Sequence, residues 1–350
     1  MLRNQNNNFI KSNVLNTTLA VNTLTDYTSS FHLENYSLRL GGSSLDTSNL
    51  LPNIKSPWLK LQGIITGNSL YGTESHNISL EWADGIAKTF DPNKSTWIVI
   101  HGLQMDSPKG DILDQLKDIK NLANAVDGFS PDDQVLVLDW RSAAYSPGFN
   151  YRGNFNIPNP VIALSWVDSA AAWTADILKQ FGITTPNINL IGHSFGSYVA
   201  STIAADVQGG INNIIALDPG NLEIGGDKYK QTKFSDNSHW SWSFYSSGFG
   251  DQDRARTADE SFLIQFPFPT QFPDVPGVNK GHGAVEELFT AMLKKASDKQ
   301  HNSLEDFFGL DRMNPIAKPW KIDYSTNWEA TLIPEEIFGS WILRNIKYNP

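Results

Sequence analysis

The sequence predicts an α/β fold, in which helices cover both faces of a mostly parallel central sheet. Three observations lead to this prediction. Short apolar runs typical of buried strands occur at residues 96–101, 135–138, 187–191 and 214–217, and helical patterns lie between them. Segments rich in Gly, Pro and Asn mark turns between these elements. The length of 350 residues suffices for one large domain with extensions. Alternating strands and helices of this kind build a parallel sheet with crossover helices.

The chain is expected to divide into three parts. Residues 1–57 are rich in Asn, Ser and Thr and are expected to form a polar leader or β arm, to which we assign no chemistry. Residues 58–300 are expected to form the main α/β domain, which opens with strand-like runs at 59–65 and 78–82. Residues 301–350 are expected to form a C-terminal extension packed on this domain or trailing it.

Four segments of the main domain are predicted helices. Apolar residues recur at helical spacing between residues 112 and 126 and again at 284–295, and residues 161–181 and 198–207 are rich in Ala. In parallel sheets of this class, ligands bind beyond the carboxyl ends of the strands. The polar residues that follow the apolar runs are therefore the candidates for a functional site.

Composition and charge exclude several classes of function. The 27 basic and 37 acidic residues give a formal net charge of −10, which repels phosphate backbones, so we expect no nucleic-acid partner. The chain has no Cys, which excludes disulfides, zinc thiolate sites and a thiol nucleophile. The polar start of the chain lacks the apolar stretch of a secretory signal. No window is expected to reach the roughly 18 apolar residues of a membrane span.

The most informative segment is the pentad Gly192-His193-Ser194-Phe195-Gly196. It fits the G-x-S-x-G nucleophile elbow, a sharp turn between a buried strand and a helix that exposes a serine hydroxyl. A bare match arises easily by chance, but here a predicted strand precedes the pentad and a predicted helix follows it. The pentad therefore makes Ser194 the candidate nucleophile.

A serine hydroxyl needs a histidine to accept its proton, and the histidine needs an acid to orient it. Asp218 ends the strand-like run at 214–217, which places it on the same sheet edge as Ser194. It is the preferred acid. The weaker alternatives are Glu223, Asp227 and Asp236.

In enzymes with a G-x-S-x-G nucleophile elbow, the histidine follows the acid along the chain. His282 is the preferred base, because its Gly-flanked segment is expected to be a flexible loop leading into the amphipathic helix. His239 lies in an aromatic strand-like run and is expected to be structural, and His301 lies in a polar segment beyond the helix.

Two backbone N–H groups are also needed to bind the developing oxyanion. Phe195, directly after the nucleophile, provides one, and Leu103, in the turn after the first buried strand, provides the other. We expect His101 and His193 to pack and form hydrogen bonds near these loops and to bind no metal.

Taken together, four segments resemble the pancreatic lipase family of α/β-hydrolases, with bacterial and especially cyanobacterial relatives. They are the pentad at 192–196, Leu217-Asp218-Pro219, Ile100-His101-Gly102 and Leu138-Asp139-Trp140. Only one helix and one strand separate Ser194 from Asp218, an order typical of this family. The resemblance covers roughly residues 96–293, and it assigns the roles of nucleophile, acid, base and oxyanion donors to the same residues.

The resemblance implies an α/β-hydrolase fold and a serine carboxylester hydrolase that acts on lipid esters, as a triacylglycerol lipase or phospholipase, through an acyl-serine intermediate. The alternatives are a thioesterase or short-chain esterase, and a non-catalytic binding protein on the same scaffold. The expected partner is an ester or lipid substrate, with a peripheral lipid interface as a further option and the oligomeric state open. An extracellular location is expected, with a cytoplasmic one as the alternative.

The sequence also departs from this family. It lacks the disulfides of vertebrate lipases, and residues 221–236 carry no recognisable calcium loop, so we expect no cofactor and no metal. Residues 265–277, rich in Phe and Pro, occupy the place of the family lid. They are expected to form either an apolar rim or lid, or a rigid connector. The C-terminal segment is too short for the family's lipid-binding β-sandwich.

Overall fold

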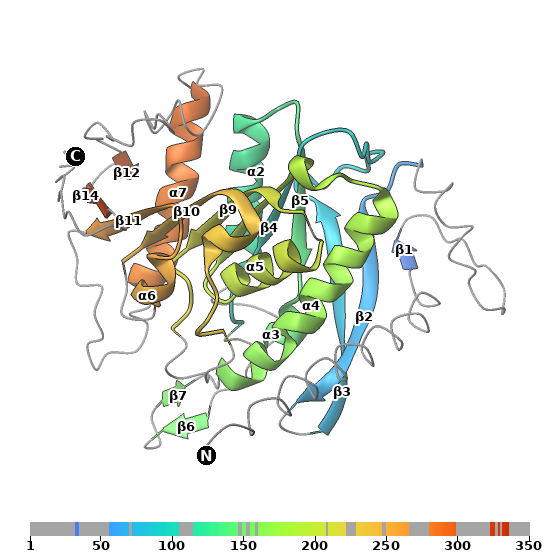
Figure 1. The fold of residues 1–350 in the computed structure, drawn as a ribbon, viewed down its shortest axis with the longest axis horizontal. Helices are drawn as coiled ribbons and strands as arrows, with labels where there is room; N and C mark the ends of the chain where they lie inside the picture. The colour runs from blue at the N-terminus through green and yellow to red at the C-terminus, as the bar shows by residue number, and fades with distance from the viewer. Residues whose placement is uncertain are drawn as a thin grey trace, which may run out of the picture.

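The computed structural model describes residues 32–34, 56–69, 72–104, 115–145, 149–151, 155–157, 160–207, 209–221, 229–246, 250–265, 280–298, 323–325, 328–329 and 331–335. A ten-stranded sheet runs through these residues (Figure 1). Its strands, in chain order, are β1 (His32–Glu34), β2 (Lys60–Ser69), β3 (Gly72–Trp82), β4 (Thr96–Ile100), β5 (Gln134–Asp139), β8 (Ile188–His193), β9 (Ile211–Leu217), β10 (Ser238–Tyr245), β11 (Glu260–Gln265) and β14 (Thr331–Glu335).

The spatial order of the strands is β1-β2-β3-β5-β4-β8-β9-β10-β11-β14. The six strands from β5 to β11 in this order are parallel to one another, whereas β1, β2, β3 and β14 join their neighbours antiparallel. The carboxyl ends of the parallel strands therefore meet at one edge, where the candidate site was expected.

The helices are α2 (Gln115–Phe129), α3 (Arg141–Ala144), α4 (Pro160–Phe181), α5 (Gly196–Asp206), α6 (Gln252–Ala255) and α7 (Lys280–Asp298), with 3-10 turns η4 (Thr185–Asn187) and η5 (Phe234–Asn237). Two small hairpins pair β6 (Phe149–Tyr151) with β7 (Phe155–Ile157) and β12 (Asp323–Ser325) with β13 (Trp328–Glu329).

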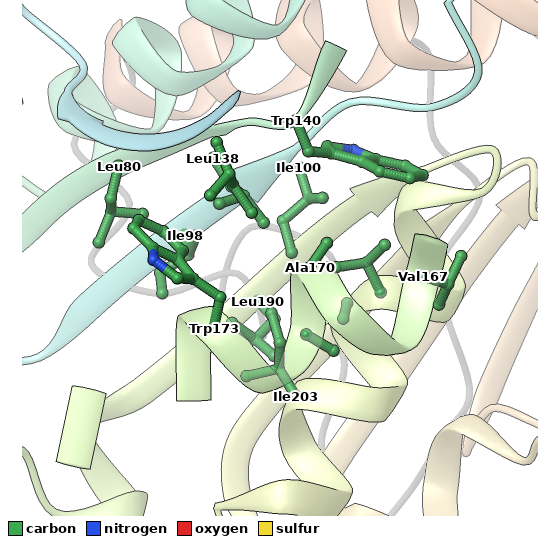
Figure 2. Packing of buried hydrophobic residues seen from close by; sticks show 14 of the residues in the cluster. Leu80, Ile98, Ile100, Leu138, Trp140, Val167, Ala170, Trp173, Leu190 and Ile203 are labelled. Carbon is green, nitrogen blue, oxygen red and sulfur yellow. The ribbon is translucent and has the colours of Figure 1, made fainter. Parts of the chain in front are cut away.

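Strand alternation divides the core between the two faces of the sheet. In β4, Ile98 and Ile100 belong to the cluster under α4 and α5, whereas Trp97 and Val99 belong to the cluster under α2 and α7. Figure 2 shows part of the first cluster, where side chains of the sheet meet those of α4 and α5. Because neighbouring residues of a strand point to opposite faces, the continuous apolar run in β4 fits a strand buried on both sides. This layered arrangement confirms the expected α/β fold.

The helix α4 lies unusually close to the sheet. A side-chain carbon added at Gly63 of β2 would overlap the indole of Trp173 on this helix, so only glycine admits that ring. By length and composition the segment Val161–Phe181 passes as one candidate membrane span among the described residues, although polar and charged residues interrupt it, so it contains no run of 18 consecutive apolar residues. It packs on the sheet, with 67% of its most apolar window buried, and core helices pass the same test.

Four features of the fold differ from, or add to, the expectations. The base-bearing segment was expected to be a loop, but His282 lies in the first turn of α7, because the helix begins at Lys280. The strand β11 had no predicted counterpart. Short strands from the expected leader and the expected C-terminal extension, β1 and β14, pair with opposite ends of the sheet. The three-part division itself stays a prediction.

Candidate active site

Ser194 lies in a strained turn between β8 and α5. Its φ angle of 55° is in the left-handed region, which side chains other than glycine rarely occupy. The backbone N–H of Ser194 donates to the carbonyl of Leu217 at 2.9 Å, which continues the pairing of β8 with β9. Strain of this kind persists only where surrounding contacts hold it, and it concentrates at functional sites.

The two glycines of the pentad permit this turn through close approach of backbone atoms. A Cβ atom at Gly192 would overlap the backbone of Gly196, and a Cβ atom at Gly196 would overlap the carbonyls of Ile100 and His101. Since neither overlap involves a movable side chain, we infer that larger residues at 192 or 196 would displace the elbow. The glycines therefore place the start of α5 directly against the end of β4.

Asp218 follows β9, again with a left-handed φ angle, of 43°. Its side chain is fully buried. The carboxylate Oδ1 accepts a hydrogen bond from the backbone N–H of Ser246 at 2.9 Å, and the N–H of Asp218 donates to Phe244 at 2.7 Å. Gly250 packs so closely on the carboxylate that a Cβ atom there would overlap it. The carboxylate therefore has a fixed orientation.

His282 reaches this carboxylate from α7. Its Nδ1 lies 2.5 Å from Oδ2 of Asp218, and the imidazole is buried. This contact leaves Nε2 as the nitrogen that would take a proton from Ser194. Among the hydrogen bonds of the described residues there is none between the Ser194 hydroxyl and the His282 ring. Such bonds are often long in unliganded enzymes and tighten only when substrate binds.

The turn that follows β4 packs directly on the nucleophile. A Cβ atom at Gly102 would overlap the side chain of Ser194, and it would lie 3.1 Å from the Ser194 Oγ. Among the hydrogen bonds of the described residues, none has the backbone N–H of Leu103 or of Phe195 as its donor, so both groups can bind an oxyanion. The structure thus brings both expected oxyanion donors to the vicinity of Ser194.

His101 stabilises this turn through a buried network. Its Nε2 accepts the backbone N–H of Trp140 at 3.1 Å, so Nδ1 carries the proton and donates to the Gly102 carbonyl at 2.8 Å. The Trp140 indole donates to the His101 carbonyl at 2.8 Å. Burial raises the pKa of Asp139, but its neighbours outweigh this and lower the pKa well below its usual value; among them is the Arg141 guanidinium, two of whose nitrogens each lie 3.0 Å from the carboxylate.

His193, the residue before the nucleophile, contacts the helix that bears His282. Its Nε2 lies 3.0 Å from the backbone carbonyl of His282, and its Nδ1 lies 3.3 Å from Oε2 of Glu286. His193 and Glu286 are both buried. The expected packing and hydrogen bonding of His101 and His193 agree with these contacts. Glu286 was not singled out from the sequence, although its position four residues after His282, on the same helix face, was a usable signal.

The alternative site residues lie elsewhere. Asp236 is exposed in η5, and His239 is exposed at the amino end of β10, away from the edge that holds Ser194. Glu223, Asp227 and His301 lie outside the described residues, as do residues 266–277 of the expected lid. The described part of the chain contains no group of three or more His, Asp or Glu side chains suited to a metal ion.

Curated proteins similar to this chain are lipases and phospholipases by name. Pancreatic lipase-related protein 2 of Mus musculus is 24% identical over 134 residues, which are 38% of this chain and 24% of the mouse protein. Phospholipase A1 of Solenopsis invicta is 28% identical over 129 residues, 33% of this chain and 34% of that protein. The matches thus span about a quarter to a third of these relatives. No protein-family model matches the chain.

Among solved structures, an esterase of Pyrobaculum calidifontis matches 72% of this chain and 90% of its own, with 14% identity and a TM-score of 0.32. An α/β serine hydrolase without lid from Xanthomonas campestris matches 55% of this chain and 75% of its own, with 16% identity and a TM-score of 0.29. The sheet and elbow of this chain have the arrangement expected of an α/β-hydrolase. The matches to curated proteins confirm the resemblance to the pancreatic lipase family that the sequence predicted.

Proposed function

We propose that this protein is a serine carboxylester hydrolase with Ser194 as nucleophile, His282 as general base and Asp218 as the acid that orients the base. One observation carries the proposal. A serine held at a φ angle of 55° shares a sheet edge with a buried pair in which His282 Nδ1 lies 2.5 Å from Asp218 Oδ2. Nucleophile, base and orienting acid in this order are the parts that serine catalysis requires.

The reaction would proceed in two halves. The Ser194 Oγ attacks the ester carbonyl carbon while Nε2 of His282 takes the hydroxyl proton, and the carbonyl oxygen becomes an oxyanion bound by the N–H groups of Leu103 and Phe195. The C–O bond to the alcohol then breaks, and His282 returns the proton to the departing alkoxide. Water, deprotonated by the same nitrogen, then attacks the carbonyl carbon of acyl-Ser194. The bond from this carbon to the Ser194 Oγ breaks, His282 returns the proton to Oγ, and the carboxylic acid is released.

We further propose lipid esters as the substrate class. The proposal is supported by the names of the similar proteins, a pancreatic lipase-related protein and phospholipases A1. A peripheral contact with a lipid surface and an extracellular location remain predictions. Neither a cofactor nor a metal enters the proposed chemistry, because the nucleophile, base and oxyanion donors are all groups of the chain.

The test compares Ser194→Ala with wild type on p-nitrophenyl esters of increasing chain length. Ser130→Ala is the matched control, because Ser130 lies after α2 at the opposite edge of the sheet. We expect hydrolysis to vanish in Ser194→Ala and to stay at the wild-type rate in Ser130→Ala. Undiminished hydrolysis in Ser194→Ala would overturn the proposal.

A fluorophosphonate probe separates the enzyme from a binding protein on the same scaffold. We expect covalent labelling at Ser194 that disappears in His282→Ala. A folded protein that is not labelled would be a binding protein. Activity on emulsified long-chain triglyceride or phospholipid supports the lipid substrate class, and activity restricted to soluble butyrate esters or thioesters replaces it with an esterase or thioesterase.

A further inference from the structure

One hydrogen bond joins the elbow to the helix that carries the base. His193 immediately precedes Ser194 in the chain, and its Nε2 lies 3.0 Å from the backbone carbonyl of His282. The two imidazole rings are also in contact, with centroids 4.7 Å apart. Because His193 and Ser194 are adjacent in sequence, this bond links the backbone of the base directly to the residue before the nucleophile.

The partners of His193 define which of its nitrogens carries the proton. A carbonyl oxygen only accepts hydrogen bonds, so Nε2 must be the donor to His282. Burial, and then the proximity of His282, lower the pKa of His193 to about 3, so the ring is neutral at physiological pH and Nδ1 is left as an acceptor. The proton on Nε2 is therefore the one that holds the backbone of the base.

Glu286 stands behind this ring, one helical turn after His282. Burial, with Asp118 and Glu287 nearby, raises the pKa of Glu286 well above its usual value, which favours the protonated carboxyl. A protonated carboxyl is a donor that suits the acceptor Nδ1, and Oε2 lies 3.3 Å from that atom. Glu286 and His193 thus form a neutral pair, because each shift disfavours the charged form of its group.

This pair is costly for the fold. Oε1 of Glu286 is buried without a hydrogen-bond partner, and Nδ1 of His193 is buried with only the 3.3 Å contact to Oε2 of Glu286. A buried polar atom left in this state costs about 1–3 kcal/mol, and an apolar pair of similar volume would avoid that cost. Buried polar groups with incomplete bonding call for an explanation in terms of function. The contact with His282 provides one.

We propose that His193 and Glu286 are positioning residues for the base: His193 holds the His282 backbone through its Nε2–H, and Glu286 keeps His193 in the tautomer that does so. The proposal rests on the proposed function of Ser194, Asp218 and His282. It assigns neither residue a contact with substrate. Its consequence is that a donor at the position of the His193 Nε2 acts together with Asp218 in setting the position of His282 relative to Ser194.

The test uses three substitutions of His193 in the full chain. His193→Gln places an amide donor near the position of Nε2, His193→Asn places one only near Nδ1, and His193→Met keeps the volume without a donor. We expect His193→Met and His193→Asn to lower kcat about tenfold, with KM within about twofold of wild type, and His193→Gln to recover most of the loss. His239→Met is the control, since His239 is exposed at the far edge of the sheet.

A spectroscopic measurement is independent of turnover. The short Nδ1–Oδ2 contact between His282 and Asp218 should give a far-downfield proton resonance, as short charge-assisted hydrogen bonds do. We expect this signal to move or broaden in His193→Asn and to return in His193→Gln. If His193→Met does not fold, the comparison of His193→Gln with His193→Asn decides alone.

The outcomes of the two proposals are distinguishable. If wild type is not labelled by fluorophosphonate, the proposed function fails, and the resonance alone tests the positioning role. If wild type is labelled but kcat and the resonance are equal in His193→Asn and His193→Gln, the positioning role is wrong and the pair is structural. Equal losses in both variants, with the resonance unmoved, would also overturn it.

Discussion

Two buried histidines flank the candidate nucleophile, and they differ in how completely their nitrogens are bonded. Both ring nitrogens of His101 are within hydrogen-bond distance of backbone groups, and the charged pair of Asp139 and Arg141 lies beside it. His193 has one such bond, to His282, and faces the Glu286 carboxyl, whose pKa burial raises. The first histidine fixes a loop within one layer of the fold. The second links two elements that are far apart in sequence and carry reacting groups, which is a functional arrangement more than a stabilising one.

The largest expected loss of kcat is that of Asp218→Asn, and it is the reference for the substitutions of both histidines. Asp218→Asn leaves His101 and His193 unchanged. Its amide oxygen would keep the bond from the Ser246 N–H, so its NH2 group, a donor, would face Nδ1 of His282 and favour the wrong tautomer. We expect kcat to fall about 10⁴-fold. Steady-state kinetics on a soluble ester measures this. Asp236→Asn, at an exposed position of η5, is the control and should keep wild-type kcat. A loss below tenfold in Asp218→Asn would show that another group orients the base.

Gly102→Ala tests the side of the site that His101 supports. The new methyl group would overlap Ser194, and displacement of a reacting group by about 1 Å costs roughly 100-fold in rate, so we expect kcat/KM to fall by about that factor. Gly128→Ala on α2 is the matched control, because a Cβ atom there meets nothing within 4 Å. Equal activity of the two variants would mean that the turn after β4 is not in contact with the nucleophile in solution.

The main effect of His101→Leu should be on the stability of the fold. The substitution leaves the N–H of Trp140 and the carbonyl of Gly102 buried without their side-chain partner, and we expect the free energy of unfolding to fall by about 2–3 kcal/mol. Urea denaturation followed by tryptophan fluorescence measures this change. The exposed His239→Leu should stay within about 0.5 kcal/mol of wild type. A similar change in both variants would contradict the structural role of His101.

The smallest expected effect is a change in how the free energy of unfolding depends on pH. Glu286 has a raised pKa in the folded state, so its contribution to stability is complete below its ordinary pKa and is lost as pH rises toward the raised value. Glu286→Gln keeps the shape and a donor without the titration. We expect the stability of wild type to fall relative to that of the variant as pH rises above the ordinary range of a glutamate pKa. Asp118, Glu287 and His193 face this carboxyl, and a pH profile unchanged by Glu286→Gln would assign the dependence to them.

Much of the central fold was predictable because local signals coincide there with tertiary structure. The pentad at 192–196 marks the elbow through two glycines that the turn requires for steric reasons. Asp218 follows a strand that is buried at every residue but one, and parallel strands must place their carboxyl ends together. In the sheet, β5 lies between β3 and β4, although it follows β4 in the chain. This order was not predictable, because strand order depends on pairing between distant segments and not on any local pattern.

The site was less predictable where long-range contacts decide. The helix α7 begins at Lys280, before His282, although two glycines in its first turn predict a loop. Contacts of its buried residues with the sheet override this low helix propensity. The role of Glu286 depends on a neighbour in another element, and no periodicity in the sequence shows that contact. The oxyanion donors are backbone atoms, so residue type gives only an indirect signal for them.

The pairing of β1 and β14 at the two ends of the sheet has a consequence for any shortened form of the chain. Open strand edges recruit other chains, and natural proteins cover them. Here β14 covers β11 and β1 covers part of β2, so short strands from outside residues 58–300 form the two outer strands of the sheet. A fragment cut at residues 58–300 would keep Ser194, Asp218 and His282 but expose the N–H and C=O groups of β11. Such a fragment would be prone to self-association, although it would keep every group that we assign to the reaction.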